Sequence, residues 1–298
     1  MINKNAMITI AGRPNVGKST LINALTGEKI AIVTNKPQTT RNRLFGVLNR
    51  GDIQYVFTDT PGFHKPRTKL GDYMVNVVKQ SVADVDAVLL LVPPVPTVGT
   101  QESLLLERIR ETGTPTVLII NKIDTVKPEE ILKVIAAYSA AYNFAAVVPI
   151  SARRGDGVEE LVAELEKYAQ DGPGLFPEGV VTDQPEKQVV AELVREKLLI
   201  CLQREVPHGT AVEVTKFSER GDEDSPIIDV DVTIYCEKAS HKGMIIGKNG
   251  AMLKKIGSLA REDIERFMGA KVFLQTWVKV KENWRDSDAA VRNFGYSE

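Results

Sequence analysis

Cysteine is nearly absent from this chain of 298 residues, which contains only Cys201 and Cys236. The two are not spaced as metal ligands, and two thiols do not make the disulfide framework typical of small secreted domains. Both lie in apolar stretches of the sequence. We therefore expect two small core side chains in a protein of a reducing, cytoplasmic compartment.

Long apolar runs are also lacking. The longest, Ala87–Val92 and Val117–Ile120, are far shorter than the ~20 residues that a membrane-spanning helix needs. The first residues do not contain the apolar stretch of a secretory signal peptide. The sequence thus predicts that any contact with a membrane is peripheral.

An excess of charge of one sign is missing as well, since the formal net charge is -1. The whole-chain balance therefore indicates no partner, and only local charge can. With 43% hydrophobic and 26% charged residues, the composition is that of an ordinary globular protein. The length suits two domains, because single domains commonly span about 100–200 residues.

The most informative stretch is Gly12-Arg13-Pro14-Asn15-Val16-Gly17-Lys18-Ser19, which has the G-x-x-x-x-G-K-S pattern of a phosphate-binding P-loop. An apolar segment, 7–11, precedes it as a strand would, and 18–25 follows as a helix. Glycines let backbone N–H groups turn toward phosphate oxygens at a helix N-terminus. Lys18 would reach the β- and γ-phosphates, and the Ser19 hydroxyl would bind Mg²⁺.

Two later segments complete a triphosphate site. In the polar loop 28–41, either Thr39 or Thr40 is placed to ligate Mg²⁺, and we favour Thr40. Two expected strands, 43–48 and 53–58, are joined by a turn and end in Asp59-Thr60-Pro61-Gly62. A carboxylate at the end of a buried strand suits Mg²⁺ and its water shell. Gly62 can bring its N–H close to a γ-phosphate.

Strands and helices then alternate. We expect strands at 87–92, 116–120 and 146–150, and helices at 101–111, 128–142 and 158–168. Alternation at this spacing predicts βαβ units around a mostly parallel sheet, and hence an α/β fold with its ligand at the carboxyl ends of the strands.

Two of those strand ends carry groups suited to guanine. Asp124, in Asn121-Lys122-Ile123-Asp124, can accept hydrogen bonds from the ring N1–H and the 2-amino group, neither of which adenine offers. Binding adenine would leave that carboxylate unpaired, which makes the discrimination large. The Lys122 stem can lie on the purine, Asn121 can bond to the P-loop, and a backbone N–H of Ser151-Ala152 can reach the guanine carbonyl.

With GxxxxGKS, DTPG, NKID and SA in this order, the first half resembles the translation-factor-related GTPases. The resemblance implies a Ras-like P-loop domain, Mg²⁺-dependent GTP hydrolysis, and switch loops near 31–41 and 59–72. The residues expected to bind GTP are Gly12, Arg13, Pro14, Asn15, Val16, Gly17, Lys18, Ser19, Thr20, Asp59, Thr60, Pro61, Gly62, Phe63, Asn121, Lys122, Ile123, Asp124, Ser151 and Ala152. The catalytic set is Lys18, Thr40 and Gly62, and the Mg²⁺ set is Ser19, Thr40 and Asp59.

Phe63 departs from the Ras pattern, in which a glutamine at this place orients the attacking water. A phenyl ring cannot do so. We therefore expect slow intrinsic hydrolysis, accelerated by a partner or a monovalent cation. The resemblance implies that Asn15 helps to bind K⁺.

A stretch rich in glycine and proline, 171–179, interrupts the alternation and indicates a domain boundary. We expect a GTPase domain at 1–172, a linker at 173–184 and a smaller α+β domain at 185–298. In the last, a helix near 185–203 with Asp183 as its N-cap precedes strands at 210–217 and 227–236. A helix at 251–267 and a strand at 272–280 follow.

Between the strand at 227–236 and the helix at 251–267 lies the GxxG sequence Gly247-Lys248-Asn249-Gly250. This order of helices, strands and GxxG loop resembles a type II KH RNA-binding module. From Lys238 to Arg285 there are 11 cationic and 4 anionic side chains, a local surplus that suits a polyanion. Trp277 and Trp284 could stack on bases, but such residues more often pack on their own domain, and for Trp277 we favour that packing. The expected RNA-binding residues are Gly247, Lys248, Asn249, Gly250, Lys242 and Lys254.

A GTPase domain followed by a KH domain resembles the bacterial Era family over nearly the whole chain, through GRPNVGKS, QTTR, DTPGF, NKID, HKGMIIGKNGAMLKKIG and KVKENWRD. The resemblance implies binding to the 3′ end of 16S ribosomal RNA, a role in assembly of the 30S subunit, and a cytoplasmic monomer with a peripheral membrane-associated fraction. The alternative is a signalling GTPase or adaptor at a membrane surface, whose basic patch meets anionic lipid. A tRNA-modifying GTPase or a double-GTPase factor would need a further helical domain, a C-terminal cysteine or a second P-loop, none of which the sequence contains.

Overall fold

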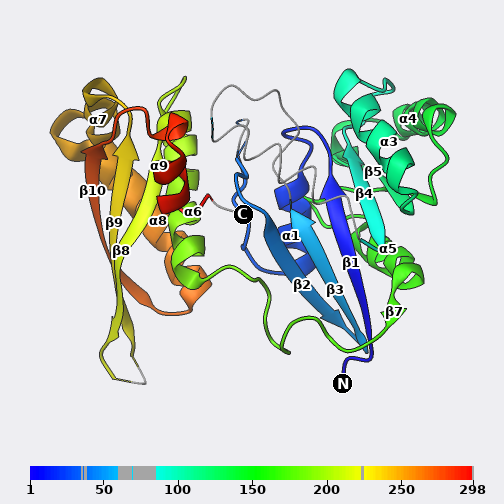
Figure 1. Ribbon diagram of the computed structural model, residues 1–298, viewed down its shortest axis with the longest axis horizontal. Coiled ribbons are helices and arrows are strands. Elements are labelled where there is room, and N and C mark those ends of the chain that lie inside the picture. The colour runs from blue at the N-terminus through cyan, green and yellow to red at the C-terminus, as the bar shows by residue number, and fades with distance from the viewer. Residues whose placement is uncertain (35, 37–38, 60–68, 70–84, 223–224, 297–298) are drawn as a thin grey trace. The chain divides into compact units, whose positions relative to one another are not determined.

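A computed structural model of the chain describes residues 1–34, 36, 39–59, 69, 85–222 and 225–296 (Figure 1). The chain divides into two compact units, with the boundary between Asp183 and Gln184. No helix in the described ranges is both long and apolar enough to cross a bilayer.

The first unit is built on a sheet whose order is β2-β3-β1-β4-β5-β6, with the short β7 paired to β1. β2 runs antiparallel to β3, while β3, β1, β4, β5 and β6 are parallel neighbours, as the alternating sequence predicts. The strands are β1 (Lys4–Ala11), β2 (Leu44–Arg50), β3 (Ile53–Asp59), β4 (Ala87–Val92), β5 (Thr116–Ile120), β6 (Ala146–Pro149) and β7 (Gln170–Asp171).

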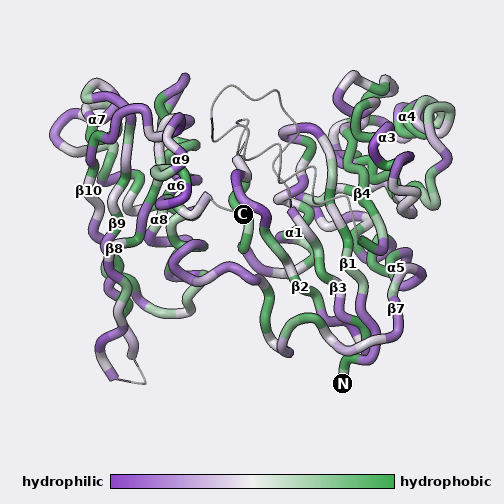
Figure 2. Tube along the Cα trace, in the orientation of Figure 1, coloured by the Kyte–Doolittle hydropathy of each residue, from purple (hydrophilic) through white to green (hydrophobic). Residues whose placement is uncertain are grey.

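Helices cover both faces of this sheet. Alternate residues of a strand point to opposite faces, and in the central strands both sets are apolar and need to be buried. On β4, Leu89 and Leu91 join one core with α1 and α5, whereas Leu90 and Val92 join another with α3 and α4. In Figure 2 the hydrophobic colour follows β4 through the middle of the unit. The helices are α1 (Lys18–Thr26), α3 (Thr100–Thr112), α4 (Pro128–Ala141) and α5 (Val158–Leu165).

The segment after β7 lies along the antiparallel edge of the same sheet. The Val47 N–H donates to the Val181 carbonyl oxygen at 2.9 Å, and the Phe45 N–H donates to Asp183 Oδ1 at 2.9 Å. The expected helix N-cap at Asp183 is therefore wrong. The next helix, α6, begins after Pro185 without a side-chain cap, because the Asp183 carboxylate is bonded to β2 instead.

The second unit is a three-stranded sheet, β10-β9-β8, with helices α6, α7 and α8 packed on one face. β8 is antiparallel to β9, and β10 is parallel to it, which is the element order expected for a type II KH domain. Ile200 of α6 lies outside this core and is 55% exposed. The elements are α6 (Glu186–Cys201), β8 (Ala211–Arg220), β9 (Ile227–Cys236), α7 (Ala239–Ile246), α8 (Ala251–Met268), β10 (Lys271–Val280) and α9 (Asp288–Asn293).

The two tryptophans occupy opposite environments, and that of Trp277 is not the expected one. Trp284 is fully buried, donates from Nε1 to the Gly209 carbonyl oxygen at 2.9 Å, and packs edge-on against Phe294. Trp277 is 44% exposed. The folded-back C-terminal segment therefore makes Trp284 a core residue of this unit, and Trp284 cannot stack on bases there.

Replacing Trp284 by alanine should lower the free energy of unfolding of this unit by about 3–5 kcal/mol, because a large buried side chain and its hydrogen bond are lost. Trp277→Ala serves as the control and should change it by less than about 0.5 kcal/mol, as exposed sites usually do. Urea unfolding followed by circular dichroism measures both. Equal losses for the two variants would contradict the assigned environments.

Candidate functional site

The P-loop connects β1 to α1 and needs glycine at two positions for steric reasons. A Cβ on Gly12 would lie 2.6 Å from the Leu91 carbonyl oxygen, and one on Gly17 would lie 2.2 Å from Asn121 Nδ2. Both glycines also have positive φ, which L side chains rarely adopt. The close approach of β4 and of the Asn121 loop therefore dictates the glycine pattern.

Lys18 begins α1 and lies across this loop, 6% exposed. Its Nζ donates to the carbonyl oxygens of Gly12 at 3.1 Å and Arg13 at 3.3 Å. Burial lowers the pKa of the ammonium group, while the Asp59 carboxylate acts in the opposite direction. The side chain is thus placed at the helix N-terminus, where phosphates are favoured.

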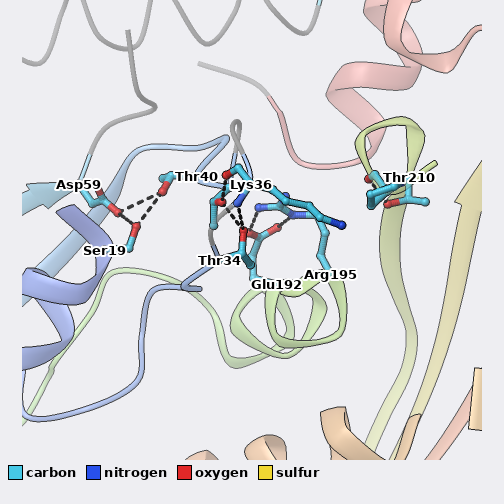
Figure 3. Close-up of polar contacts among 10 residues, drawn as sticks. Ser19, Thr34, Lys36, Thr40, Asp59, Glu192, Arg195 and Thr210 are labelled. Carbon is cyan, nitrogen blue, oxygen red and sulfur yellow. Dashed lines mark hydrogen bonds and ion pairs between the residues drawn. The ribbon is translucent and has the colours of Figure 1, made fainter. Parts of the chain in front are cut away.

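Three oxygen-bearing side chains from three segments meet beside the P-loop (Figure 3). Ser19 Oγ donates to Asp59 Oδ2 at 2.8 Å and lies 3.0 Å from Thr40 Oγ1, which is 3.3 Å from the same carboxylate oxygen. Two hydroxyls and a carboxylate are the hard oxygen donors that Mg²⁺ prefers. The residues present therefore fit this ion.

Thr40, rather than Thr39, takes part in this cluster. The Thr39 hydroxyl lies 2.7 Å from Thr34 Oγ1 and donates to the Lys36 carbonyl oxygen. The two neighbouring threonines, which the sequence pattern does not separate, thus have different partners in the fold.

Asn121 joins the loops that surround the cavity. Its Nδ2 donates to the Val16 carbonyl oxygen at 2.8 Å, and its Oδ1 accepts from the N–H groups of Lys122 at 2.8 Å and Ala152 at 3.0 Å. The P-loop, the loop after β5 and the loop after β6 are therefore held by one amide. Of the two N–H groups of which one is expected to reach guanine, that of Ala152 donates to Asn121 and that of Ser151 donates to the Asp156 carbonyl oxygen at 2.9 Å.

Asp124 lies on the far side of the same cavity. Its Oδ1 accepts a hydrogen bond from Ser151 Oγ at 2.7 Å, and Arg154 Nε lies 3.7 Å from Oδ2. The Ser151 hydroxyl, helped by nearby arginines, holds the pKa of the Asp124 carboxyl below its usual value against the effect of burial. Lys122 crosses from this loop to the P-loop, donating from Nζ to the Asn15 carbonyl oxygen at 2.7 Å.

Lys18, Ser19, Thr40, Asn121, Lys122 and Asp124 all line one cavity of about 480 Å³, which suits a ligand of nucleotide size. Sequence reasoning did not place six residues of its wall among those expected to bind GTP: Ile32, Val33, Thr34, Lys36, Thr125 and Arg153. It also missed Glu102 of α3, a carboxylate 2% exposed whose Oε1 lies 3.4 Å from Nε of the P-loop residue Arg13. No local pattern marks Glu102, because only the packing of α3 brings it to the loop.

Four residues predicted for the site, Thr60, Pro61, Gly62 and Phe63, lie outside the described residues. Two further members of the predicted nucleotide set lie next to the loops described above. Thr20 is in α1, directly after the P-loop, and Ile123 directly follows Lys122 in the loop after β5.

In the second unit, the GxxG sequence forms a tight turn between α7 and α8. Gly247, Asn249 and Gly250 all have positive φ, and a Cβ on Gly247 would lie 2.7 Å from Met252 Cβ. The turn thus presents its backbone at the surface. Lys242 on α7, Lys248 in the turn and Lys254 on α8 are all exposed.

Comparisons with known proteins agree with this division of the chain. Residues 7–122 match the family described as 50S ribosome-binding GTPase, and residues 205–285 match the KH domain family. The chain is 50% identical over 293 residues to the GTPase Era of Ruminiclostridium cellulolyticum, with 98% of this chain and 97% of that protein covered.

Two solved structures match nearly the whole chain with a TM-score of 0.93. One is Era in complex with MgGDPNP and nucleotides 1506–1542 of 16S ribosomal RNA, 35% identical, with 100% of both chains covered. The other is a substituted Era of Aquifex aeolicus bound to GDP and AlF4⁻, 36% identical, covering 99% of this chain and 100% of that one.

The geometry around Asp124 generates a test of base recognition. Asp124→Asn should weaken GTP binding on the order of 10³-fold, because the amide nitrogen faces the donors of guanine. Xanthosine triphosphate, which carries a carbonyl at the position of the 2-amino group, should regain affinity through the new amide donor. Titration of the variant with GTP and with xanthosine triphosphate measures the two affinities. If the variant binds both nucleotides equally weakly, Asp124 does not have the assigned role.

Proposed function

This chain belongs to the Era family of GTPases, and we propose that it is a GTP-controlled switch that binds the 3′ end of 16S ribosomal RNA during assembly of the 30S subunit. The observation that carries the proposal is the presence, in one chain, of a P-loop cavity lined by the Asp124 carboxylate and of a GxxG turn with exposed lysines in it and on the helices beside it. The complex of a relative with MgGDPNP and 16S ribosomal RNA nucleotides supports the choice of both ligands.

In the proposed GTP complex, the backbone N–H groups from Gly12 to Gly17 hold the phosphates. The Lys18 ammonium would exchange its two carbonyl acceptors for phosphate oxygens. Ser19, Thr40 and Asp59 would hold Mg²⁺, which when bound neutralises charge on the β- and γ-phosphates. The Thr40 and Gly62 loops would respond to the γ-phosphate, which makes them the switch elements.

We further propose that intrinsic hydrolysis is slow. Phe63 takes the place of a water-orienting glutamine, so this chain needs help to position the attacking water. We assign part of that help to K⁺ near Asn15, whose backbone has a φ of 63° at the rim of the cavity.

Asn15→Gly tests the role of K⁺, because glycine keeps the positive φ of this position and removes only the side chain. In the unchanged chain, hydrolysis should be at least about tenfold faster in potassium than in sodium buffer, because one positioned cation stabilises the charge that develops in the transition state. In the variant this ratio should fall to about one. Single-turnover hydrolysis in the two buffers measures it, and a ratio that survives in the variant would refute the assignment.

For the RNA site, Gly250→Asp places a carboxylate where phosphates are expected, and no heavy atom lies within 4 Å of the new Cβ. Gly269→Asp is a matched control, because Gly269 also has positive φ and open space around it. We expect Gly250→Asp to weaken binding to the 3′ end of 16S ribosomal RNA by about tenfold or more through charge repulsion, and Gly269→Asp to leave it unchanged.

We also propose a mainly cytoplasmic protein with a peripheral membrane-associated fraction.

The Gly250→Asp and Gly269→Asp variants also separate the RNA-binding proposal from the alternative of a membrane-surface adaptor. Loss of RNA binding with intact binding to anionic vesicles supports the RNA function. Loss of vesicle binding with intact RNA binding would support the adaptor.

A further inference from the structure

The open face of the KH sheet displays two aromatic rings on one edge strand. Along β10, the even-numbered residues Val272 and Val278 join the core beneath the helices. The odd-numbered residues point to the other face, where Phe273 is 50% and Trp277 is 44% exposed. Four residues of strand separate the rings by about 13 Å, which gives each ring room for its own planar ligand.

Charge on this strand is of one sign. Lys271 and Lys279 flank the rings on the same face, Gln275 lies between them, and β10 contains no acidic residue. A stripe that alternates cationic and aromatic side chains is the arrangement with which proteins hold single-stranded nucleic acid, since lysines follow the phosphates and rings stack on the bases.

The neighbouring strand β9 carries Asp229 and Asp231 on this face, in register with Phe273 and Gln275. The Asp229 carboxylate is paired with Arg220 at 2.8 Å and Lys216 at 3.6 Å. The charge of Asp229 is thereby largely neutralised, whereas Asp231 adds an acidic side chain on the inner side of Gln275, and the cationic edge is on β10. Phosphates are therefore favoured along the outer edge of the strand, with the bases turned inward over the rings.

The C-terminal segment covers the other end of the same face. Phe294 packs on Tyr235 with ring centroids 4.8 Å apart, and Lys281 Nζ lies 4.6 Å above the Phe294 ring. On this face, the Tyr235 ring is therefore packed against Phe294, whereas Phe273 and Trp277 are exposed. A protein interface would favour a core depleted in charge, and here both rings are flanked by lysines.

We propose that the face of β10 formed by Lys271, Phe273, Gln275, Trp277 and Lys279 is a second contact surface for single-stranded RNA, on which two bases stack outside the GxxG site. The inference rests on the proposed RNA-binding function. β10 is continuous with that site, because α7 and α8 pack against its inner side. A KH groove takes about four nucleotides, so a longer RNA would have further bases available for the two rings.

The chain contains only two tryptophans, and Trp284 is buried, so a ligand stacked on Trp277 is visible in the intrinsic fluorescence. The test uses the full chain with two RNAs from the 3′ end of 16S ribosomal RNA, one of about four nucleotides, which fills one KH groove, and one of about twelve. At saturation, the longer RNA should quench the emission of Trp277 and the shorter one should not.

Phe273→Ala and Trp277→Ala should each weaken binding of the longer RNA by about tenfold to a hundredfold, as expected for the loss of one stacked base. Binding of the shorter RNA should be unchanged. Ile200→Ala is the control, since Ile200 is an exposed apolar residue of the same unit, on α6. Circular dichroism verifies that each variant is folded.

Equal affinity of the longer RNA for the variants and the unchanged chain, or an unquenched Trp277 at saturation, would overturn the proposal. Failure of both RNAs to bind the unchanged chain would refute the RNA-binding function itself. The failure of the RNA-binding function can thus be told apart from the failure of the proposed surface on β10. Self-association that Trp277→Ala abolishes without affecting RNA binding would assign the face to a second copy of the chain and would also overturn it.

Discussion

The nucleotide cavity depends on the side-chain amide of Asn121. This amide donates to the P-loop at Val16 and accepts from the backbone of Lys122 and Ala152, so it uses both of its polar atoms within the protein. Its 2% exposure means that these bonds form away from water, where an unmade hydrogen bond is costly. The loops that follow β1, β5 and β6 therefore have a common anchor. The position of Asp124 follows from that anchor, because Asp124 lies three residues further along the same loop.

Both units present backbone at a turn in which glycine is required, but the steric reasons differ. In the P-loop, neighbouring loops approach so closely that a Cβ would overlap Leu91 or Asn121. In the GxxG turn, Gly247 is restricted by Met252, whereas Gly250 has open space and is favoured by its backbone angle alone. Glycine can therefore be favoured in such a turn either by packing that excludes side chains or by a backbone angle with positive φ. A turn of the second type tolerates an added side chain more easily, so the space over Gly250 remains accessible to a ligand.

Much of the fold could be predicted from the sequence, because strands and helices of the first unit are long, regular and bounded by strong turn residues. The strand at 87–92 agrees with the structure at both ends, and the choice of Thr40 over Thr39 agrees with the contacts. What could not be predicted depends on contacts between distant segments. Asp183 has the features of an N-cap, yet the edge of β2 offers its carboxylate a backbone N–H, and that bond prevails. Glu102 reaches the P-loop only because α3 packs beside it.

The environments of the two tryptophans show why such errors are informative. Local pattern treats Trp277, within an expected strand, as a residue that packs on its own domain, and leaves Trp284, in the tail, as a candidate for stacking on bases. The structure reverses this, because the tail folds back and supplies Phe294 and Tyr296 as neighbours of Trp284. Burying Trp284 stabilises the unit, whereas leaving Trp277 at the surface forgoes the free energy that burial of a large ring provides. A side chain that departs from local consistency without a structural gain is expected at functional positions. The exposed edge of β10 meets that description, since its inner side chains complete the core and its outer aromatic pair contributes little to it.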